Sequence, residues 1–546
     1  MAAAIRLTQS GNGGGSSKVD EFDIVVIGGG SGGSAAAGRL SEDGKYSVCL
    51  IEAGGKNTDI RVRAPGLFPF LPSSTNWQFE TVPQPGLNGR TGYQPRGRGL
   101  GGSSAINAMV YIRGCAWDYD NWAALGCDGW AYKDVLPYFK RAEGNVRGAD
   151  DFHGADGPLT VSDQTHPNPG SLHFVDAAAS LQLPRNDDFN GARFEGVGLY
   201  QVTQRKGERW TSARAYVEGQ RDAGRLSVET GALVEKVLIE DGRATGVIFR
   251  QGSKRRTIRA RRAVILAGGV FGTAQLLMLS GIGPADHLRA HGIPVLIDRA
   301  GVGENLQDHI DYVAGFETGG SVFTGTNIRT IFRTAGALWQ WIRTRSGPMT
   351  TNYAEAGGFA RSAPDVAVPD IQFHFVPAIL EDHGRESVRQ PGFSGHVCVL
   401  RPESRGTVRL ASADPSAAPL IDPGFLTDRR DMEVLKKGVR LLHRILTSPP
   451  LSYHGGKDRH ATPLDDDDAL EQMIRNRADT VYHPVGTARM GSDDAAVCDT
   501  HLRVRGVHGL YVADASIMPR LVSGNTNAPS IMIGERCADF VRADLG

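Results

Sequence analysis

The sequence predicts an α/β protein, α+β overall, in which a Rossmann-like dinucleotide-binding domain is joined to a second domain built on an antiparallel sheet with helices. Three observations predict this class. A β-branched run enters a glycine-rich turn near the N-terminus, similar segments recur in the middle and near the end of the chain, and alternating strands with a few long helices lie between them. At 546 residues the chain exceeds the usual size of one domain.

The first element is a buried strand that runs into a glycine-rich turn and a helix. The apolar run "FDIVVIG" (22–28) is typical of a strand covered on both faces, and "SAAAGRL" (34–40) is a helix whose small residues allow close packing. This order aims the free N–H groups of the helix N-terminus at a pyrophosphate, and missing Cβ atoms leave room for the phosphates. The predicted phosphate-binding residues of this G-x-G-x-x-G turn are Gly28, Gly30, Ser31 and Gly33.

The second element, "YSVCLIEAG" (46–54), is predicted as the neighbouring parallel strand and contains Glu52. A carboxylate at this point accepts hydrogen bonds from a ribose diol and disfavours a 2′-phosphate. The alternative interpretation is a tight turn with a surface glutamate. Strand context and Glu52 together favour dinucleotide binding, but these two elements leave the choice between FAD and NAD open.

Glycine-rich segments then recur along the chain. They are "GRGLGGSSAINAMVYIRG" (97–114), "RAVILAGGVFGTAQLLMLSGIG" (262–283), "GVGENLQDH" (301–309) and "GLYVADASIMP" (509–519). The first is too long for a plain turn, which indicates that something flat lies against it. The second is a buried strand, a turn and a helix, and the last is a strand that leads into a small-residue turn. Dinucleotide-domain material is therefore expected at the start, the middle and the end of the chain.

Together these motifs resemble those of the glucose-methanol-choline family of flavin oxidoreductases, over residues 21–546. The first signature block, from Gly97 to Asp120, matches throughout. The second ends in "SGIG" (280–283) and departs from the family pattern at Val270 and Ala274, which affects the local turn.

The resemblance implies FAD as the cofactor, with Gly28, Gly30 and Gly33 at its pyrophosphate and Glu52 at its adenosine ribose. Ile106 stands where choline-type relatives with a covalent flavin carry a histidine, and because an alkane has no nucleophilic atom the FAD is expected to be bound non-covalently. The further implied contacts are Gly101, Gly102, Ser103, Asn107 and Ala108 beside the flavin and pyrophosphate, Val234 at the adenine, Asp514 and Ala515 near the ribityl and phosphate groups, and Asn527 and Pro529 on the pyrimidine side. For Val234, an ordinary place in a strand core is an equal alternative.

Two residues near the C-terminus are the predicted catalytic pair. His483 lies in "VYHPVGTARMG" (481–491), where Pro484 restricts the backbone, and Asn525 lies in "SGNTNAPSIMIGE" (523–535). The resemblance places His483 at flavin N5 and Asn525 at the second active-site position. Oxidation of an alcohol removes a proton from oxygen, and a neutral imidazole suits that task because its ordinary pKa lies near working pH. We expect His483 to be the general base and Asn525 to hold the substrate hydroxyl.

The same motifs divide the chain into two predicted domains after a flexible lead-in at residues 1–20. A discontinuous FAD-binding domain is expected at 21–160, 225–312 and 480–546, and a substrate-binding domain at 161–224 and 313–479. In the resembled family the antiparallel sheet covers the active face of the flavin. Candidates for the substrate site are Phe373, Phe375, Val376 and Tyr482, most of them equally plausible as core. No carboxylate marks a site for the ammonium group of choline.

Composition excludes several classes of function. The 60 basic and 60 acidic side chains balance, which argues against nucleic acid or an anionic membrane as a partner. No apolar run reaches the roughly 18 residues of a membrane span, and without a secretory signal the expected location is cytoplasmic, with a short transit peptide left open. The six scattered cysteines are expected to be reduced. No metal site is predicted, because the acidic run "LDDDDALEQM" (464–473) suits a helix N-terminus and His309 and His501 are interpreted as structural.

The predicted function is FAD-dependent oxidation of a primary alcohol to an aldehyde, by an oxidase or dehydrogenase that passes the electrons to oxygen or another acceptor. The first alternative is a lyase of the same family that uses the same histidine with no net redox. The second is a flavin-binding protein without catalysis, which the pair of His483 and Asn525 disfavours.

Overall fold

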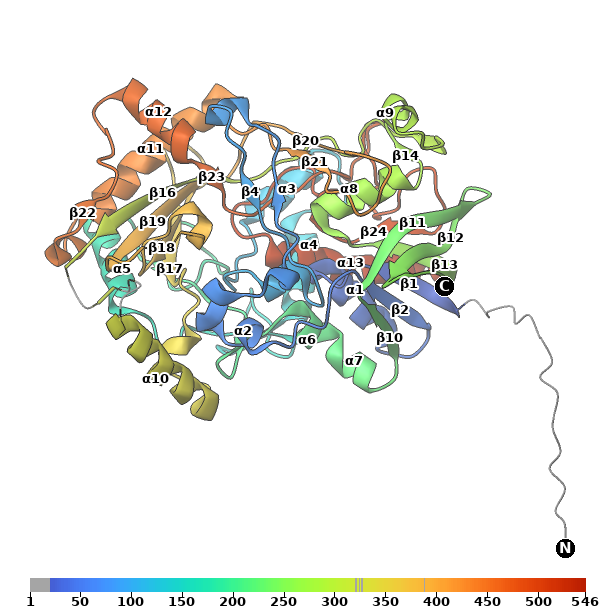
Figure 1. The fold of residues 1–546 in the computed structure, drawn as a ribbon, viewed down its shortest axis with the longest axis horizontal. Coiled ribbons are helices and arrows are strands. Elements are labelled where there is room, and N and C mark those ends of the chain that lie inside the picture. The colour runs from blue at the N-terminus through green and yellow to red at the C-terminus, as the bar shows by residue number, and fades with distance from the viewer. Residues whose placement is uncertain (1–19, 320–321, 324, 326–327, 387) are drawn as a thin grey trace, which may run out of the picture.

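The computed structural model describes residues 20–319, 322–323, 325, 328–386 and 388–546, and it contains two seven-stranded sheets (Figure 1). The predicted lead-in lies outside the described residues except for Asp20, where the first strand begins. One sheet is seen at the right of Figure 1 and the other at the left, with irregular chain and short helices between them.

The first sheet combines strands from distant parts of the sequence. Its order is β10-β2-β1-β13-β12-β11, and β24 also pairs with β13. All pairs are parallel except those of β11 with β12 and of β12 with β13. The strands are β1 (Asp20–Ile27), β2 (Val48–Glu52), β10 (Leu226–Thr230), β11 (Ala232–Glu240), β12 (Arg243–Gln251), β13 (Lys254–Leu266) and β24 (Leu510–Val512). This is the predicted Rossmann-like arrangement, with β1 leading into helix α1 (Ser31–Ser41).

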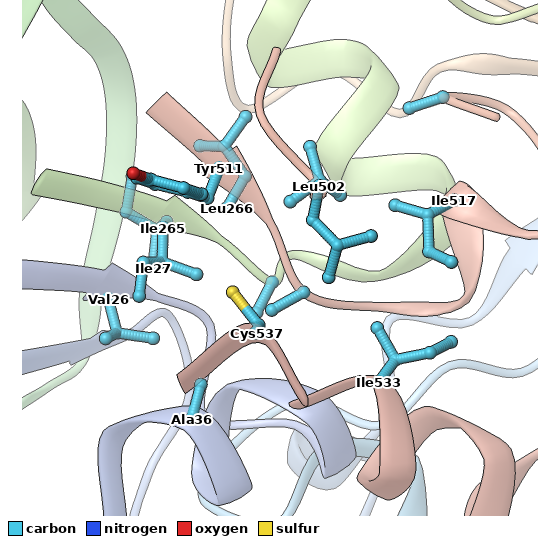
Figure 2. Close-up of a cluster of buried hydrophobic side chains, with 14 of the residues drawn as sticks. Val26, Ile27, Ala36, Ile265, Leu266, Leu502, Tyr511, Ile517, Ile533 and Cys537 are labelled. Carbon is cyan, nitrogen blue, oxygen red and sulfur yellow. The ribbon is translucent and has the colours of Figure 1, made fainter. Parts of the chain in front are cut away.

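The core of this sheet lies against α1 and α13 (Asn527–Leu545). Figure 2 shows part of it, where Ile27 and Leu266 from the strands belong to one cluster with Cys537 of α13. The two helices approach through glycine, because a Cβ on Gly534 would lie 2.2 Å from the Gly32 oxygen. The close packing predicted from the small residues of α1 therefore continues onto the C-terminal helix and holds the two ends of the chain together.

The second sheet is antiparallel throughout, in the order β22-β16-β19-β18-β17-β7, with β23 also paired to β16. Its strands are β7 (Gly196–Leu199), β16 (Ile310–Glu317), β17 (Ala356–Ala360), β18 (Ile371–Val376), β19 (Gly392–Val399), β22 (Lys457–Asp458) and β23 (Asp479–Thr480). Helices α5 (Pro169–Ser180) and α11 (Arg429–Leu446) pack on it. The predicted fold class is confirmed.

Side chains alternate between two environments along β18. Phe373 and Phe375 belong to the core with Phe174 of α5 and Leu442 of α11, whereas His374 and Val376 line a cavity on the opposite face. Of the four substrate-site candidates, Val376 and Tyr482 are therefore at the cavity, and the two phenylalanines are core.

The other helices complete the two units. They are α2 (Ile60–Arg63), α3 (Ala116–Ala124), α4 (Tyr132–Ala142), α6 (Ser212–Tyr216), α7 (Glu218–Asp222), α8 (Gly269–Leu279), α9 (Ala285–Ala290), α10 (Ile328–Thr344) and α12 (Asp467–Arg477). Asp466 caps α12, as its acidic run indicates. Within the described ranges, no helix combines the length and apolarity needed to cross a membrane. The domain boundaries stay a proposal, and β16 crosses the boundary drawn at residue 312.

Candidate active site

A continuous cavity of about 1840 Å³ is lined by both sheets and the loops between them. It exceeds the roughly 300–1,000 Å³ of an ordinary small-ligand pocket, which leaves room for a dinucleotide and a second small molecule. The first sheet and its loops contribute Gly28, Val234 and Asp514, and the second contributes His374 and Val376.

The glycine turn after β1 forms one end of this cavity. Gly28 has φ +99°, and a Cβ there would lie 2.2 Å from the Ala267 oxygen, so this glycine is required by the backbone itself. Gly30 differs, because an added Cβ would meet no protein atom closer than 4.0 Å and would project into space that the protein leaves open. Gly30 also begins α1 without a side-chain cap, so the first N–H groups of the helix are available to an anion. This end of the cavity fits a pyrophosphate.

Glu52 lies beside this turn with its carboxylate already fixed by the backbone. It accepts hydrogen bonds from the N–H groups of Gly29 at 2.8 Å, Gly54 at 2.8 Å and Gly99 at 2.9 Å. Because a carboxylate offers about four acceptor sites, it retains capacity for a ribose hydroxyl. The three backbone bonds also tie the two glycine-rich blocks together.

Most of the predicted cofactor residues meet at the cavity. Those that line it are Gly28, Gly30, Ser31, Glu52, Gly102, Ser103, Asn107, Ala108, Val234, Asp514, Ala515 and Asn527. Gly33, Gly101 and Pro529 are not among the lining residues. Gly33 packs under the turn, where a Cβ would lie 2.0 Å from the Gly28 oxygen, Gly101 has φ +94°, and Pro529 is in the first turn of α13.

His483 and Asn525 also line the cavity, and their side chains touch. The Asn525 Nδ2 group donates to His483 Nε2 at 3.1 Å. The His483 loop is held by Asp308, which accepts from the His483 backbone N–H at 2.9 Å and from the Thr480 hydroxyl at 2.5 Å. Tyr482, with φ +74°, donates its N–H to Thr480 Oγ1 at 2.6 Å. The strained backbone next to His483 is therefore fixed by two side chains.

A directed chain of hydrogen bonds determines which nitrogen of His483 carries the proton. His309 Nε2 lies 3.0 Å from the Leu400 carbonyl, which can only accept, so His309 is protonated at Nε2. Its Nδ1 must then accept from His483 Nδ1, 3.0 Å away. His483 is thus the Nδ1–H tautomer, and its Nε2 lone pair is directed at Asn525 and the cavity.

Burial keeps both rings neutral. It lowers the pKa of His309 to about 3. The pKa of His483 falls well below its ordinary value because of burial first, and then because of His309, His374 and the cation Arg96. At neutral pH the Nε2 atom of His483 is therefore unprotonated and can accept a proton.

Asn525 is oriented by a neighbour from the second sheet. Gln372 Nε2 donates to Asn525 Oδ1 at 3.1 Å, which turns the Asn525 amide nitrogen toward His483. The same Gln372 nitrogen lies 3.1 Å from His374 Nε2. Both groups of the predicted pair thus have a second residue that fixes their orientation.

Beyond this pair the cavity lining contains both apolar side chains and several ionisable ones, among them Glu381, Arg459 and His460. Val376, Ile379 and Leu380 contribute apolar surface. Asp311 Oδ2 and His396 Nδ1 lie 2.7 Å apart, and both residues line the cavity.

Sequence reasoning missed Asp308, His309 and Gln372 as partners of the pair. His309 is buried and hydrogen-bonded as a structural histidine would be, but one of its bonds goes to His483. The block "GVGENLQDH" was a visible signal, because it ends with both Asp308 and His309. Nothing in the local sequence singled out Gln372, apart from its position on the same face of β18 as His374 and Val376. Among the described residues no cluster of possible metal ligands occurs.

Known proteins match this chain over most of its length. The family model described as GMC oxidoreductase matches residues 22–311, and a second model with the same description matches 402–534. The chain is 44% identical over 511 residues to an alcohol dehydrogenase (acceptor) of Pseudomonas putida, covering 92% of this chain and 93% of that protein. The chain belongs to the GMC oxidoreductase family.

Two further comparisons agree with this membership. The chain of this GMC oxidoreductase is 40% identical over 510 residues to the oxygen-dependent choline dehydrogenase of Brucella ovis, covering 92% of each. Its structure matches an FAD-dependent oxidoreductase from Chaetomium thermophilum with a TM-score of 0.87 and 28% identity, covering 96% of this chain and 99% of that one. The GMC protein is therefore an enzyme that acts on CH–OH donors, with FAD as the cofactor that its family supports. The glycine cradle and Glu52 fit that cofactor.

Proposed function

We propose that this GMC oxidoreductase oxidises a neutral primary alcohol to an aldehyde, with His483 as general base and Asn525 as the group that positions the hydroxyl. The observation that carries the proposal is the directed chain from Leu400 through His309 to His483, which leaves an unprotonated Nε2 facing the cavity. FAD, when bound, supplies the acceptor for the substrate hydride.

The protein's own groups handle the proton. A hydroxyl between His483 Nε2 and Asn525 Nδ2 donates to the first and accepts from the second, in place of their direct 3.1 Å contact. His483 then takes the hydroxyl proton at Nε2, while its Nδ1–H stays bound to His309. Because Asn525 is neutral, it orients the hydroxyl oxygen through a hydrogen bond and adds no charge to the site.

We propose that FAD is held without a covalent bond. Ile106 lines the cavity. By the resemblance it stands where relatives with a covalent flavin carry a histidine, and its alkane side chain has no nucleophilic atom. The uncapped N-terminus of α1, the open space at Gly30 and the Glu52 carboxylate would supply the binding instead.

A neutral alcohol is the substrate class that the cavity favours. Both relatives carry names that denote alcohol oxidation, and one of them is named for choline. In this chain Arg96 lines the cavity and lowers the pKa of His483, and the Asp311 carboxylate is bound by His396. Glu381, a second carboxylate of the lining, is paired with Arg459, His460 and Arg477. A quaternary ammonium group would thus meet a cation and carboxylates that already have basic partners.

Anaerobic bleaching of the bound flavin by a panel of alcohols tests the proposal. We expect rapid bleaching by aliphatic or benzylic primary alcohols and slow bleaching by choline. His483→Ala should retain yellow FAD and lose the alcohol-dependent reduction. If no alcohol bleaches the wild-type flavin, the proposed oxidation of alcohols is wrong and the lyase alternative gains support. Peroxide release compared with dye reduction then separates an oxidase from a dehydrogenase.

A further inference from the structure

Helix α10 (Ile328–Thr344) carries an exposed apolar stripe in addition to its buried face. Trp341 is buried and packs with Leu67 and Met349, which fixes the helix on the protein. On the other side, Trp339 is 61% exposed and Ile342 is 50% exposed. Ala335 continues this exposed face at helical spacing. We call Ala335, Trp339 and Ile342 the outer stripe.

The surroundings of the outer stripe are basic, although the whole chain is neutral. Residues 318–354 contain four arginines and no aspartate or glutamate. The Arg343 guanidinium lies over the Trp339 ring, 4.9 Å from its centroid. The balanced total charge therefore hides a local positive field.

A second segment adds to this charge. The turn at Lys206 is tied to α10, because Trp341 Nε1 donates to the Gly207 carbonyl at 2.7 Å, and Lys206 is exposed. Next to it Glu208 pairs with Arg63, Arg214 and Arg345, so one carboxylate faces three guanidinium groups. Arg343 lies on the outer stripe itself, and Arg63, Lys206 and Arg345 gather where the buried side of α10 is held. We call these four residues the cationic rim.

The cavity opens near this surface. Thr334 of α10 and Phe70 both line the cavity, and Phe70 is 60% exposed, which marks its mouth. Phe70 ends the 3₁₀ helix Pro65–Phe70, whose Leu67 packs on Trp341 of α10.

We propose that the outer stripe and the cationic rim bind the surface of an anionic lipid bilayer. A helix with tryptophan and isoleucine on one face and arginines beside them has the character of an interfacial helix, in which the apolar side chains enter the headgroup region and the cations meet anionic lipids. The arginines beside the stripe match anionic headgroups, whereas a second copy of this chain would bring the same cations against them, so a second copy is a poorer occupant. The inference concerns binding alone and stands without the proposed reaction. Joined to that reaction, it places the substrate entrance beside a reservoir of apolar alcohols.

Co-sedimentation of the full-length holoenzyme with vesicles tests this proposal. We expect binding to phosphatidylcholine vesicles that contain about 30% phosphatidylglycerol, at least about tenfold weaker binding to pure phosphatidylcholine, and weakening when NaCl rises from about 50 to about 500 mM. Trp339→Ser with Ile342→Ser should lower the partition coefficient about tenfold, and Lys206→Glu with Arg343→Glu should remove the preference for anionic vesicles.

The matched control is Leu296→Ser with Tyr453→Ser, which removes apolar side chains of 50% and 79% exposure that do not line the cavity. This control should bind as the wild type does. Flavin content and thermal unfolding establish that each variant is folded. The proposal is overturned if the wild type does not bind anionic vesicles. It is also overturned if the control variant loses as much vesicle binding as the Trp339 and Ile342 variant does. A dimer in solution that the Trp339 and Ile342 substitutions abolish overturns it in favour of a second copy. Because no alcohol is turned over, a failure here is independent of the catalytic assignment.

Discussion

Replacement of His309 tests whether the tautomer of His483 is set by its buried neighbour. In the wild type, His309 Nδ1 accepts from His483 Nδ1–H at 3.0 Å. In His309→Leu, this N–H loses its acceptor. A buried donor without an acceptor costs about 1–3 kcal/mol. At about 1.4 kcal/mol per factor of ten, this corresponds to a roughly 5- to 150-fold loss if it falls on the reactive tautomer. We therefore expect kcat/KM to fall about 10- to 100-fold.

His309→Gln is the matched control. A glutamine amide can donate to the Leu400 carbonyl and accept from His483 Nδ1, as the imidazole does. This variant should keep most of the activity, whereas the leucine variant should not. Stopped-flow reduction of the flavin under anaerobic conditions measures the difference, with flavin content and thermal unfolding as measures of folding.

The pH profile separates positioning from simple structural damage. Burial is the main cause that lowers the pKa of His483, and His309 is the next. A base with a lowered pKa stays unprotonated as pH falls below 6.5, so the wild-type kcat/KM should remain on a plateau there. His309 is neutral at these pH values, so its replacement by leucine removes an acceptor for the protonated His483 and no charge. The acid limb should therefore not move to higher pH in His309→Leu. Equal rates for the two variants, or an acid limb that moves to higher pH in the leucine variant, would refute the tautomer argument.

Three further predictions concern the cofactor cradle, the positioning amide and the thiols. Gly30→Ala should leave the thermal unfolding of the apoprotein unchanged and reduce FAD occupancy, because its Cβ enters open space, whereas Gly32→Ala, whose Cβ would lie 1.9 Å from the Ala513 oxygen, should lower the unfolding temperature. Equal melting of both glycine variants would contradict this. Asn525→Ala should retain FAD and reduce flavin reduction about 100-fold through lost orientation, and an unchanged rate would remove it from the site. All six cysteines are buried, and burial raises the pKa of Cys49 to about 12, so Ellman's reagent should label none quickly in the native enzyme and six after denaturation.

Features that follow from the local sequence were predictable, whereas contacts between residues far apart in the sequence were not. The strand, turn and helix around Gly28 lie within one continuous stretch, where each residue type suits its own backbone. Phe373 lies in the core and Val376 at the cavity because they are on opposite faces of β18. Both faces of this strand carry apolar residues, so the sequence does not indicate which face the helices cover. The bond of His309 to His483 joins residues 174 positions apart, and no periodicity reports such a contact.

Charge, more than shape, separates the substrates that the names of the two relatives suggest. Around the reacting position the chain places groups that burial keeps neutral, His483 and His374, together with the neutral amide of Asn525. The cation Arg96 lines the same cavity, and its field helps keep the base unprotonated. A second cation from the substrate would strengthen that effect on His483 but would itself be repelled, and attraction to Asp311 would come at the expense of the bond to His396. An apolar alcohol incurs neither penalty, and it is also the ligand that gains most from a cavity mouth beside a bilayer.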